Sequence, residues 1–481
     1  MLFNSIHFLI FFPIVAALYF TIKHKYRWIF LLVTSYYFYM SWKVEYTVLL
    51  LISTVVTFYT AIAIVKSSNQ RLKQFYLWTS IIINVSMLFF FKYFNFVTDS
   101  VREFLALFSI QFEPFVLNVL LPVGISFYTF QAISYSVDVY NNKINPERNF
   151  GMYALYHSFF PQLVAGPIER AGNLLHQFYE EHKFEYKRVV DGLKLMLWGF
   201  FKKVVVADRL AIIVNTVYNN VGDYTGIYLL VGTIFFAFQI YCDFSGYSDI
   251  AIGSAQVMGF RLMDNFKRPY FSKSIPEFWR RWHISLSSWF RDYLYIPLGG
   301  SKISVPRWYF NLFIIFLVSG LWHGAKWTFI IWGILHGIYM ISSPFTKKWR
   351  EYIVNKVGLD RSTRIHNLFK IAFVFSLVCF SWIFFRANNV HDAFYIISKI
   401  FSDFNFEFSA HLLNIGWPTL IIALFSIALL EFVHLIQSHI SIREFLDSKA
   451  LYIRWGILIM IIISILLFGV FEQTEFIYFQ F

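Results

Sequence analysis

The sequence has little charge and almost no cysteine. Charged residues make up 14% of its 481 residues and hydrophobic residues 58%, which excludes an ordinary soluble globular domain and predicts a polytopic membrane protein. Both cysteines, Cys242 and Cys379, lie in apolar segments. They provide neither a disulfide framework nor the spacing of zinc ligands, so we expect them to pack in the core.

Long uncharged runs recur along the chain, and each is long enough to cross about 30 Å of hydrocarbon. We place them at Leu2–Ile22, Tyr46–Val65, Gln74–Phe91, Phe115–Val137, Tyr224–Cys242, Trp308–Ala325, Trp327–Thr346, Ala410–Leu430 and Trp455–Phe471. Shorter or broken runs lie at Trp28–Trp42, Phe150–Ile168, Leu195–Gly222 and Ile371–Phe385. The sequence therefore predicts an all-α integral membrane protein with about ten to thirteen transmembrane helices.

The basic residues predict an orientation in the membrane. The first apolar run lacks the basic start and small-residue cleavage site of a signal peptide, so we expect it to remain as an anchor. Loops rich in Lys and Arg stay in the cytoplasm. Such loops contain Lys23, Lys25 and Arg27 near the start and Arg443, Lys449 and Arg454 before the final run. We therefore expect both termini to be extracytoplasmic.

The main polar interruption extends from Arg261 to Arg307, with nine Lys and Arg against three acidic residues. Ser274 and Glu277 have the spacing of a capping box and predict a helix start. In the helix that follows, aromatic and apolar residues share one face and arginines lie outside it. The apolar face contains Phe278, Trp282, Leu286, Trp289 and Tyr293, and the arginines are Arg280, Arg281 and Arg291. This amphipathic cytoplasmic helix suits either contact with anionic lipid or a specific anionic ligand.

An ionisable residue inside an apolar run is costly and often functional. His323 lies in "LVSGLWHGAKW", where Gly320 and Gly324 permit close approach and Trp322 and Trp327 could wall a dry pocket. An imidazole can accept a proton from a hydroxyl and return it, as acyl transfer requires. The alternative is a histidine that is hydrogen-bonded between helices.

Two other histidines, His336 and His283, could likewise be functional or structural. Thirteen residues of continuous helix between His323 and His336 would separate the imidazoles by about 20 Å, so they could not share a metal ion, and we expect His336 to be structural. His283 lies beside the arginines of the amphipathic helix. It could contact a cytosolic ligand or make an interfacial hydrogen bond.

Polar residues also occur in "QIYCDFSGYSDIAIG", where Asp243, Ser245 and Asp249 lie near the end of an apolar run. The glycine of a nucleophile elbow is missing. Orientation of another side chain or a hydrogen bond between helices fits better.

The chain ends in "FEQTEFIYFQF", directly after the last apolar run. Its apolar residues surround Tyr478 and suggest a tail that tucks back into the helices. A phenol, with pKa near 10, is a better leaving group than a sugar hydroxyl, so an aryl ester at Tyr478 could pass on an acyl group. An anchoring belt of interfacial aromatic residues is the alternative.

Taken together, these segments resemble the membrane-bound O-acyltransferase family, in particular its bacterial alginate O-acetylase branch. The resemblance rests on "FPQLVAGPIER", "QIYCDFSGYSDIAIG", "NFKRPYFSKSIPEFWRRWHISLSSWFRDYLYIPLGG", "VSGLWHGAKWTFIIWGILHG" and the terminal "FIYFQF". It spans about residues 120 to 481, and the combination is far more specific than any single motif.

The resemblance implies a helical bundle with a central funnel, in which His323 is the catalytic histidine and His283 the second conserved polar position. It implies a cytosolic acetyl-CoA donor and no permanently bound cofactor. Acetyl would pass to an extracytoplasmic SGNH-type acetyltransferase acting on a polysaccharide such as alginate or peptidoglycan. By analogy with a D-alanine export system, Tyr478 would hold the acyl group. We expect a bacterial inner-membrane enzyme with the lipid bilayer around it, no metal and no nucleic-acid partner.

Within one membrane domain, 1–481, we expect N-terminal spans in 1–114, a catalytic core in 115–346 that includes the basic segment 261–307, and C-terminal spans and tail in 347–481. Expected substrate-binding residues are Trp322, Trp327, Arg280, Arg281, Trp282, Asp243 and Ser245. Two alternatives are a transporter or flippase, and an acyltransferase acting on a lipid or secreted protein. A pair of inverted repeats with matching interrupted helices would favour a transporter. We find no such pair in the sequence.

Overall fold

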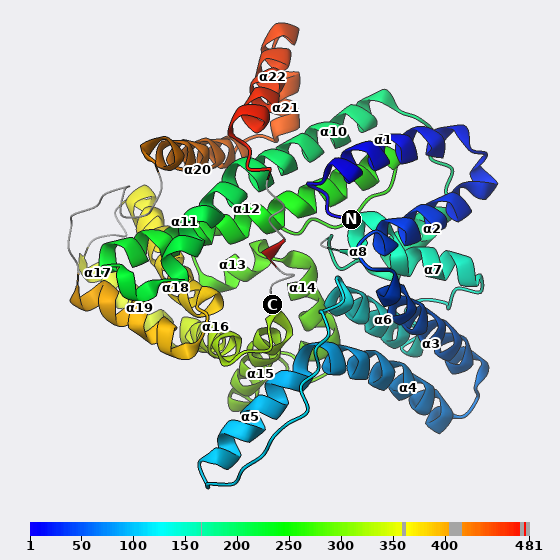
Figure 1. Cartoon of the computed structure of the whole chain (residues 1–481), viewed down its shortest axis with the longest axis horizontal. Helices are drawn as coiled ribbons and strands as arrows, with labels where there is room; N and C mark the ends of the chain where they lie inside the picture. Colours follow the sequence, from blue (N-terminus) through cyan, green and yellow to red (C-terminus); the bar gives the residue numbers. More distant parts are fainter. Residues whose placement is uncertain (165, 358–361, 404–415, 472–475, 478–481) are drawn as a thin grey trace. The chain divides into compact units, whose positions relative to one another are not determined.

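The computed structural model describes residues 1–481 except 165, 358–361, 404–415, 472–475 and 478–481. The described residues contain helices and no strands, which confirms the expected all-α class (Figure 1). They divide into two compact units. The first contains Met1–Met196 and Ile250–Met263, and the second contains Leu197–Asp249 and the described residues from Asp264 onward.

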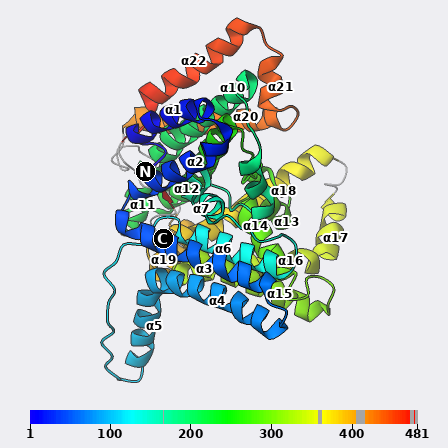
Figure 2. The same cartoon turned by 90° about the vertical axis from the view of Figure 1, so that its right-hand side faces the viewer.

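Among its described residues the first unit contains nine complete α-helices and most of a tenth, together with the last turns of α12 (Gly226–Met258). The first ten are α1 (Ile6–Thr21), α2 (His24–Met40), α3 (Thr47–Lys66), α4 (Gln70–Leu88), α5 (Phe94–Ala106), α6 (Ile125–Tyr140), α7 (Phe150–Ser158), α8 (Phe160–Leu163), α9 (Ala171–Leu174) and α10 (Tyr186–Phe200). Helices α3, α4 and α6 lie side by side (Figures 1 and 2). An apolar cluster that includes Leu50, Leu88 and Tyr128 fills the space between them.

Buried polar side chains also join these helices. Ser53 of α3 donates to Asn84 Oδ1 of α4 at 2.5 Å, and its hydroxyl lies 3.0 Å from His157 Nε2 of α7. Apolar side chains gain little by leaving lipid for another helix, so interhelical hydrogen bonds and close packing contribute much of the cohesion of a membrane bundle. The apolar runs alone did not reveal this polar network.

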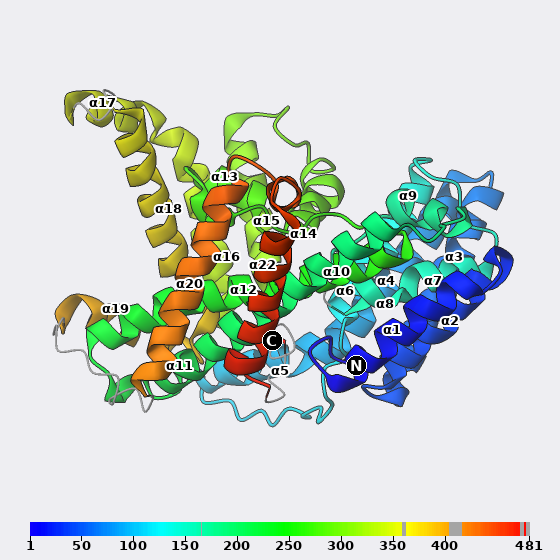
Figure 3. The same cartoon turned by 90° about the horizontal axis from the view of Figure 1, so that it is seen from above.

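The second unit contains the remaining helices. They are α11 (Asp208–Tyr218), most of α12 (Gly226–Met258), α13 (Ile275–Arg281), α14 (Ile284–Phe290), α15 (Val305–His323), α16 (Trp327–Phe345), α17 (Lys347–Val357), α18 (Thr363–Arg386), α19 (Val390–Ser402), α20 (Trp417–Gln437), α21 (Ile442–Asp447) and α22 (Leu451–Phe468). Helix α16 packs on both α15 and α18, and α17 lies at one end of α18 (Figure 3).

Helices α15 and α16 form a hairpin that approaches closely at two glycines. A Cβ added to Gly320 would lie 2.4 Å from the carbonyl oxygen of Phe329, and one added to Gly333 would lie 2.4 Å from that of Phe316. Small residues permit this contact between membrane helices. Gly320 therefore serves the hairpin that carries His323.

Eight helical segments of the described chain are long and apolar enough to cross a membrane, and the shorter α1 is also apolar. The expected run Phe115–Val137 is wrong as a span, because its first half is not helical and α6 begins only at Ile125. The run Phe150–Ile168 is broken between α7 and α8. Several expected crossings are thus shorter or interrupted, and the multi-pass membrane class holds.

The single amphipathic helix expected after Ser274 is also wrong. Ser274 does cap a helix by accepting from Glu277 N at 3.2 Å, but α13 ends at Arg281 and α14 begins at Ile284. Between them His283 has φ +43°, a left-handed conformation that residues other than glycine rarely adopt. Helical periodicity does not reveal such a break, because Phe278, Trp282 and Leu286 are buried on either side of it.

Candidate active site

His323 is the last residue of α15 and is 2% exposed. Its imidazole lies among aromatic rings, with centroid distances of 5.0 Å to Trp322, 4.9 Å to Trp332 and 5.4 Å to Phe385. These rings come from α15, α16 and α18. The sequence pattern identified the first of them and missed the other two.

The turn between α15 and α16 builds this enclosure. The chain is extended at Gly324, with φ −163° and ψ 151°, and α16 begins three residues later. Its second turn brings Trp332 back alongside His323. Trp327, which we expected to wall the pocket, is 51% exposed, so Trp332 and Phe385 supply the aromatic surface on that side.

His283 is fully buried, and its ring centroid lies 6.4 Å from that of His323. Its Nδ1 lies 3.1 Å from Asn265 Oδ1. Because an amide oxygen only accepts, Nδ1 carries the proton and donates, so Nε2 of the neutral ring carries the lone pair. His283 lies outside the helices long enough to span the membrane, and burial lowers its pKa to about 3. The ring is therefore neutral near pH 7.

Asn265 holds the break between α13 and α14, and nothing in the sequence pattern singled it out. Its side-chain oxygen also accepts from Ser285 N at 3.3 Å and from Ser285 Oγ at 2.9 Å, and its amide donates to Ser248 Oγ at 3.2 Å. Its backbone carbonyl accepts from Ile284 N at 2.9 Å. These bonds stabilise the left-handed conformation of His283 and orient its ring.

His336 lies closer to the site than a continuous helix would allow. The turn at Gly324 makes α15 and α16 a hairpin, so His323 and His336 both pack on Trp332, at 4.9 and 4.8 Å. The expected separation of about 20 Å is therefore wrong, because it assumed one helix.

Both nitrogens of His336 make hydrogen bonds. Nδ1 accepts from Trp279 Nε1 at 3.3 Å, so Nε2 carries the proton and lies 2.9 Å from Ser381 Oγ. Among the described residues no cluster of three His, Cys, Asp or Glu is arranged to hold a metal. These bonds fit the structural role expected for His336.

Asp243 and Ser245 belong to a buried charge network on α12. Lys203 Nζ lies 2.8 Å from Asp243 Oδ1 and 2.8 Å from Asp208 Oδ1. Lys202 Nζ donates to Ser245 Oγ at 2.9 Å and pairs with Asp249 at 2.7 Å. A π-helical turn at Phe201–Ala207 carries both lysines. Such π-helical turns are common at functional sites. The sequence analysis did not identify the turn at Phe201–Ala207.

The start of the terminal "FIYFQF" motif is buried in the second unit. Phe476 is 0% exposed and lies 4.5 Å from Tyr247 and 5.6 Å from Phe244 between ring centroids. Ile477 N donates to Asp243 Oδ2 at 2.8 Å. Phe244 also contacts His283 at 4.6 Å, so one ring separates the tail from that histidine. Tyr478 lies outside the described residues.

The arginines of the basic segment lie in different environments. Arg280 is exposed, whereas Arg281 is half-buried and its Nη2 lies 2.5 Å from Glu277 Oε1. Trp282 is fully buried against Phe278 and Trp382. Trp282 thus packs inside the second unit, while Arg280 faces outward.

The structure is that of a multi-pass membrane protein with two neighbouring buried histidines, and near its C-terminus Phe476 and Ile477 are buried. Residues 148–387 match the model of the membrane-bound O-acyltransferase family. The chain is 38% identical over 501 residues to a protein of Pseudomonas putida named "Probable alginate O-acetylase", with full coverage of both chains. It therefore belongs to the membrane-bound O-acyltransferase family and is an O-acyltransferase.

More distant relatives have other named acceptors. The chain is 34% identical to a peptidoglycan O-acetyltransferase of Helicobacter pylori over 394 residues, which covers 76% of this chain and 72% of the relative. It is 27% identical over 288 residues to a teichoic acid D-alanyltransferase of Bacillus subtilis, covering 57% of this chain and 71% of the relative. The names of the three relatives give alginate, peptidoglycan and teichoic acid as the molecules that they modify.

Proposed function

We propose that this protein takes acetyl groups from cytosolic acetyl-CoA and transfers them for O-acetylation of an extracytoplasmic polysaccharide, either an alginate-type exopolysaccharide or peptidoglycan. The observation that carries the proposal is the buried imidazole of His323, enclosed by Trp322, Trp332 and Phe385. The names of the two O-acetylating relatives support the acetyl group and the polymer acceptor.

In this mechanism His323 is the general base. Its imidazole accepts the proton of the acceptor hydroxyl while the hydroxyl oxygen attacks the thioester carbonyl carbon. The carbon–sulfur bond then breaks, and the imidazolium returns the proton to the departing thiolate. The aromatic rings exclude water, which would otherwise hydrolyse the thioester. His283 is the second catalytic group, since its oriented neutral ring can accept a hydrogen bond from the acceptor hydroxyl at Nε2.

The donor approaches through the basic segment 261–307 of the proposed catalytic core, 115–346. Six of its basic residues are exposed in the second unit: Lys267, Lys273, Arg280, Arg291, Lys302 and Arg307. Basic side chains attract the phosphates of coenzyme A. Arg280 and Arg281 belong to this path, and Trp282, the next residue, is fully buried.

Tyr478 is the proposed acyl carrier, one residue after the contact between Ile477 and Asp243. Asp243 is a positioning residue here, because its carboxylate pairs with Lys203 and accepts the hydrogen bond from Ile477 N. An acetyl ester at Tyr478 is tested by mass spectrometry of the C-terminal peptide after incubation with acetyl-CoA. No adduct, together with an active Tyr478→Phe, removes Tyr478 from the mechanism.

The acetyl group then passes to an extracytoplasmic SGNH-type acetyltransferase. This hand-off requires an inner-membrane location with both termini outside the cytoplasm, as the basic loops favour. Cysteine accessibility at Ile6 and at Phe471, which are 76% and 60% exposed, with a membrane-impermeant reagent on intact cells, tests that orientation. Labelling at both positions supports it, and protection of either contradicts it.

The cell envelope provides the direct test of the acceptor. Ester-linked acetate on envelope polysaccharides is measured with and without this protein, and we expect it to disappear from one polymer in the deletion strain. Transport without covalent change, or acetate on a lipid or secreted protein instead, would contradict the proposal. Restoration by wild-type protein and not by His323→Ala assigns the loss to the histidine site.

A further inference from the structure

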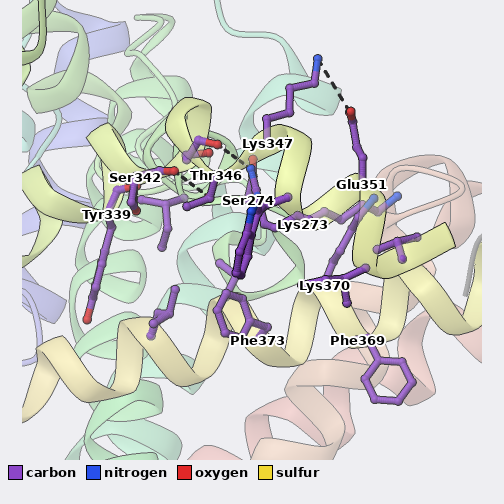
Figure 4. Close-up of a pocket in the computed structure, with 18 of the residues that line it drawn as sticks. Lys273, Ser274, Tyr339, Ser342, Thr346, Lys347, Glu351, Phe369, Lys370 and Phe373 are labelled. Carbon is purple, nitrogen blue, oxygen red and sulfur yellow. Dashed lines mark hydrogen bonds and ion pairs between the residues drawn. The ribbon is translucent and has the colours of Figure 1, made fainter. Parts of the chain in front are cut away.

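A large pocket lies in the second unit, at the end of α16 remote from His323. Its volume is about 1170 Å³, and it lies between the start of α13, the last turns of α16, helix α17 and the first half of α18 (Figure 4). Much of its wall is apolar. The residues of that wall are Ile338, Ile353, Phe369, Phe373, Val374 and Leu377.

The rim of this pocket is basic. Lys273, Lys347, Arg350 and Lys370 line it, and Glu351 is the acidic residue among them. Glu351 lies 3.9 Å from Lys347 (Figure 4), and Arg350 donates to the carbonyl oxygen of Ser343 at 2.5 Å. The rim therefore carries a net positive charge beside an apolar wall.

Helix α17 has the composition of a helix that lies at a membrane surface. Trp349 is 77% exposed and Tyr352 is 66% exposed, and four Lys and Arg accompany one Glu in "KKWREYIVNKV". Such basic helices with exposed aromatic residues bind at the level of lipid headgroups. The helices that it joins, α16 and α18, are long and apolar enough to span the bilayer.

The pocket is separate from the acyl-transfer site. The lining of the pocket begins on α16 at Ile338, six residues or about 9 Å along the helix axis beyond Trp332, which packs on His323. Neither His323 nor any of the three rings that enclose it lines the pocket, so a molecule confined to the pocket does not reach the imidazole.

We propose that this pocket binds one anionic phospholipid, with its phosphate among Lys347, Arg350 and Lys370 and its acyl chains along the wall formed by α16 and α18. A soluble anion would gain nothing from the apolar wall, and a zwitterionic lipid would gain little from the excess of cations. The anionic headgroup matches the basic rim of the pocket, and the acyl chains match its apolar wall. This inference rests on the membrane location of the chain and is independent of the proposed reaction.

Native mass spectrometry of the full-length protein tests the site. The protein is released from detergent in an equimolar mixture of phosphatidylglycerol and phosphatidylcholine with identical acyl chains. We expect one retained phosphatidylglycerol per protein. Each basic side chain near an anionic headgroup contributes about fivefold in affinity, so Lys347→Ala, Arg350→Ala and Lys370→Ala together should weaken retention about 100-fold.

A matched triple variant provides the control. Lys348, Lys356 and Arg364 are exposed, lie on the same two helices and do not line the pocket. Their replacement by alanine also removes two lysines and one arginine, and it should leave lipid retention unchanged. Equal retention of both lipids, an equal loss in both triple variants, or displacement of phosphatidylglycerol by millimolar inorganic phosphate would overturn the proposal.

Discussion

The substitution Asn265→Ala should lower both the stability of the protein and its transfer rate. Asn265 is 1% exposed and makes four side-chain hydrogen bonds, to His283, to Ser248 and twice to Ser285. A buried hydrogen bond contributes about 1 kcal/mol net. Loss of all four should therefore lower the free energy of unfolding by about 4 kcal/mol, measured by thermal unfolding in detergent.

The effect on the rate comes from the ring of His283. The bond from Nδ1 to Asn265, at 3.1 Å, favours one tautomer by about 1 to 1.5 kcal/mol. Without it the other tautomer becomes populated, which alone about halves the fraction of rings with the lone pair at Nε2, and the ring orientation is less constrained, so acetyl transfer should fall by at least about twofold. The assay follows radiolabelled acetyl from acetyl-CoA to acceptor at a temperature where the variant remains folded.

Asn311 provides a matched control for this substitution. It is also buried, at 0% exposure, and donates to the carbonyl oxygen of Leu298 at 2.9 Å. Asn311→Ala should lower stability by about 1 kcal/mol and preserve the rate of the folded protein. A folded Asn265→Ala that transfers acetyl at the wild-type rate would refute the role assigned to the orientation of His283.

Three further substitutions test the surrounding structure. Lys203→Met leaves Asp208 and Asp243 as neighbouring buried carboxylates and should cost about 3 to 5 kcal/mol; an unchanged melting temperature would contradict the network. Gly333→Val should cost about 1 to 3 kcal/mol, because its Cβ would lie 2.4 Å from a carbonyl oxygen of α15; wild-type stability would refute that close contact. The pKa of His283 is about 3 in the folded protein and near 6.5 when unfolded. Its stabilisation is therefore complete above about pH 6.5 and is lost as the pH falls toward 3. The melting temperature of wild-type protein should fall more steeply over that range than that of His283→Gln, and parallel curves would contradict the shift.

Some features could be predicted from the sequence because they depend on local patterns. Uncharged runs identify spans, since the length of hydrocarbon to be crossed is fixed. Ser274 and Glu277 identify a helix start, because a cap depends on residues three positions apart. The prediction that His323 is catalytic came from the resemblance to known motifs and not from periodicity.

Other features depend on contacts between distant segments. His283 interrupts an apparently continuous amphipathic pattern because Asn265, eighteen residues away, stabilises its left-handed conformation. Trp332 and Phe385 enclose His323 because α16 folds back and α18 packs on it. Lys203 lies in the broken apolar run Leu195–Gly222, where nothing in the sequence indicated its partners, and it is 1% exposed in the fold, between two aspartates. Tertiary pairing decides each of these positions, and no local pattern encodes it.

The central claim is that the imidazole of His323 transfers the proton during acyl transfer. The most direct test is the initial rate at which purified protein moves radiolabelled acetyl from acetyl-CoA to its acceptor, with His336→Gln as the control because His336 packs on the same Trp332. His323→Ala should lower the rate by about 10²- to 10⁴-fold while remaining folded, and His336→Gln should retain it. A His323→Ala protein that transfers acetyl at close to the wild-type rate would contradict the account.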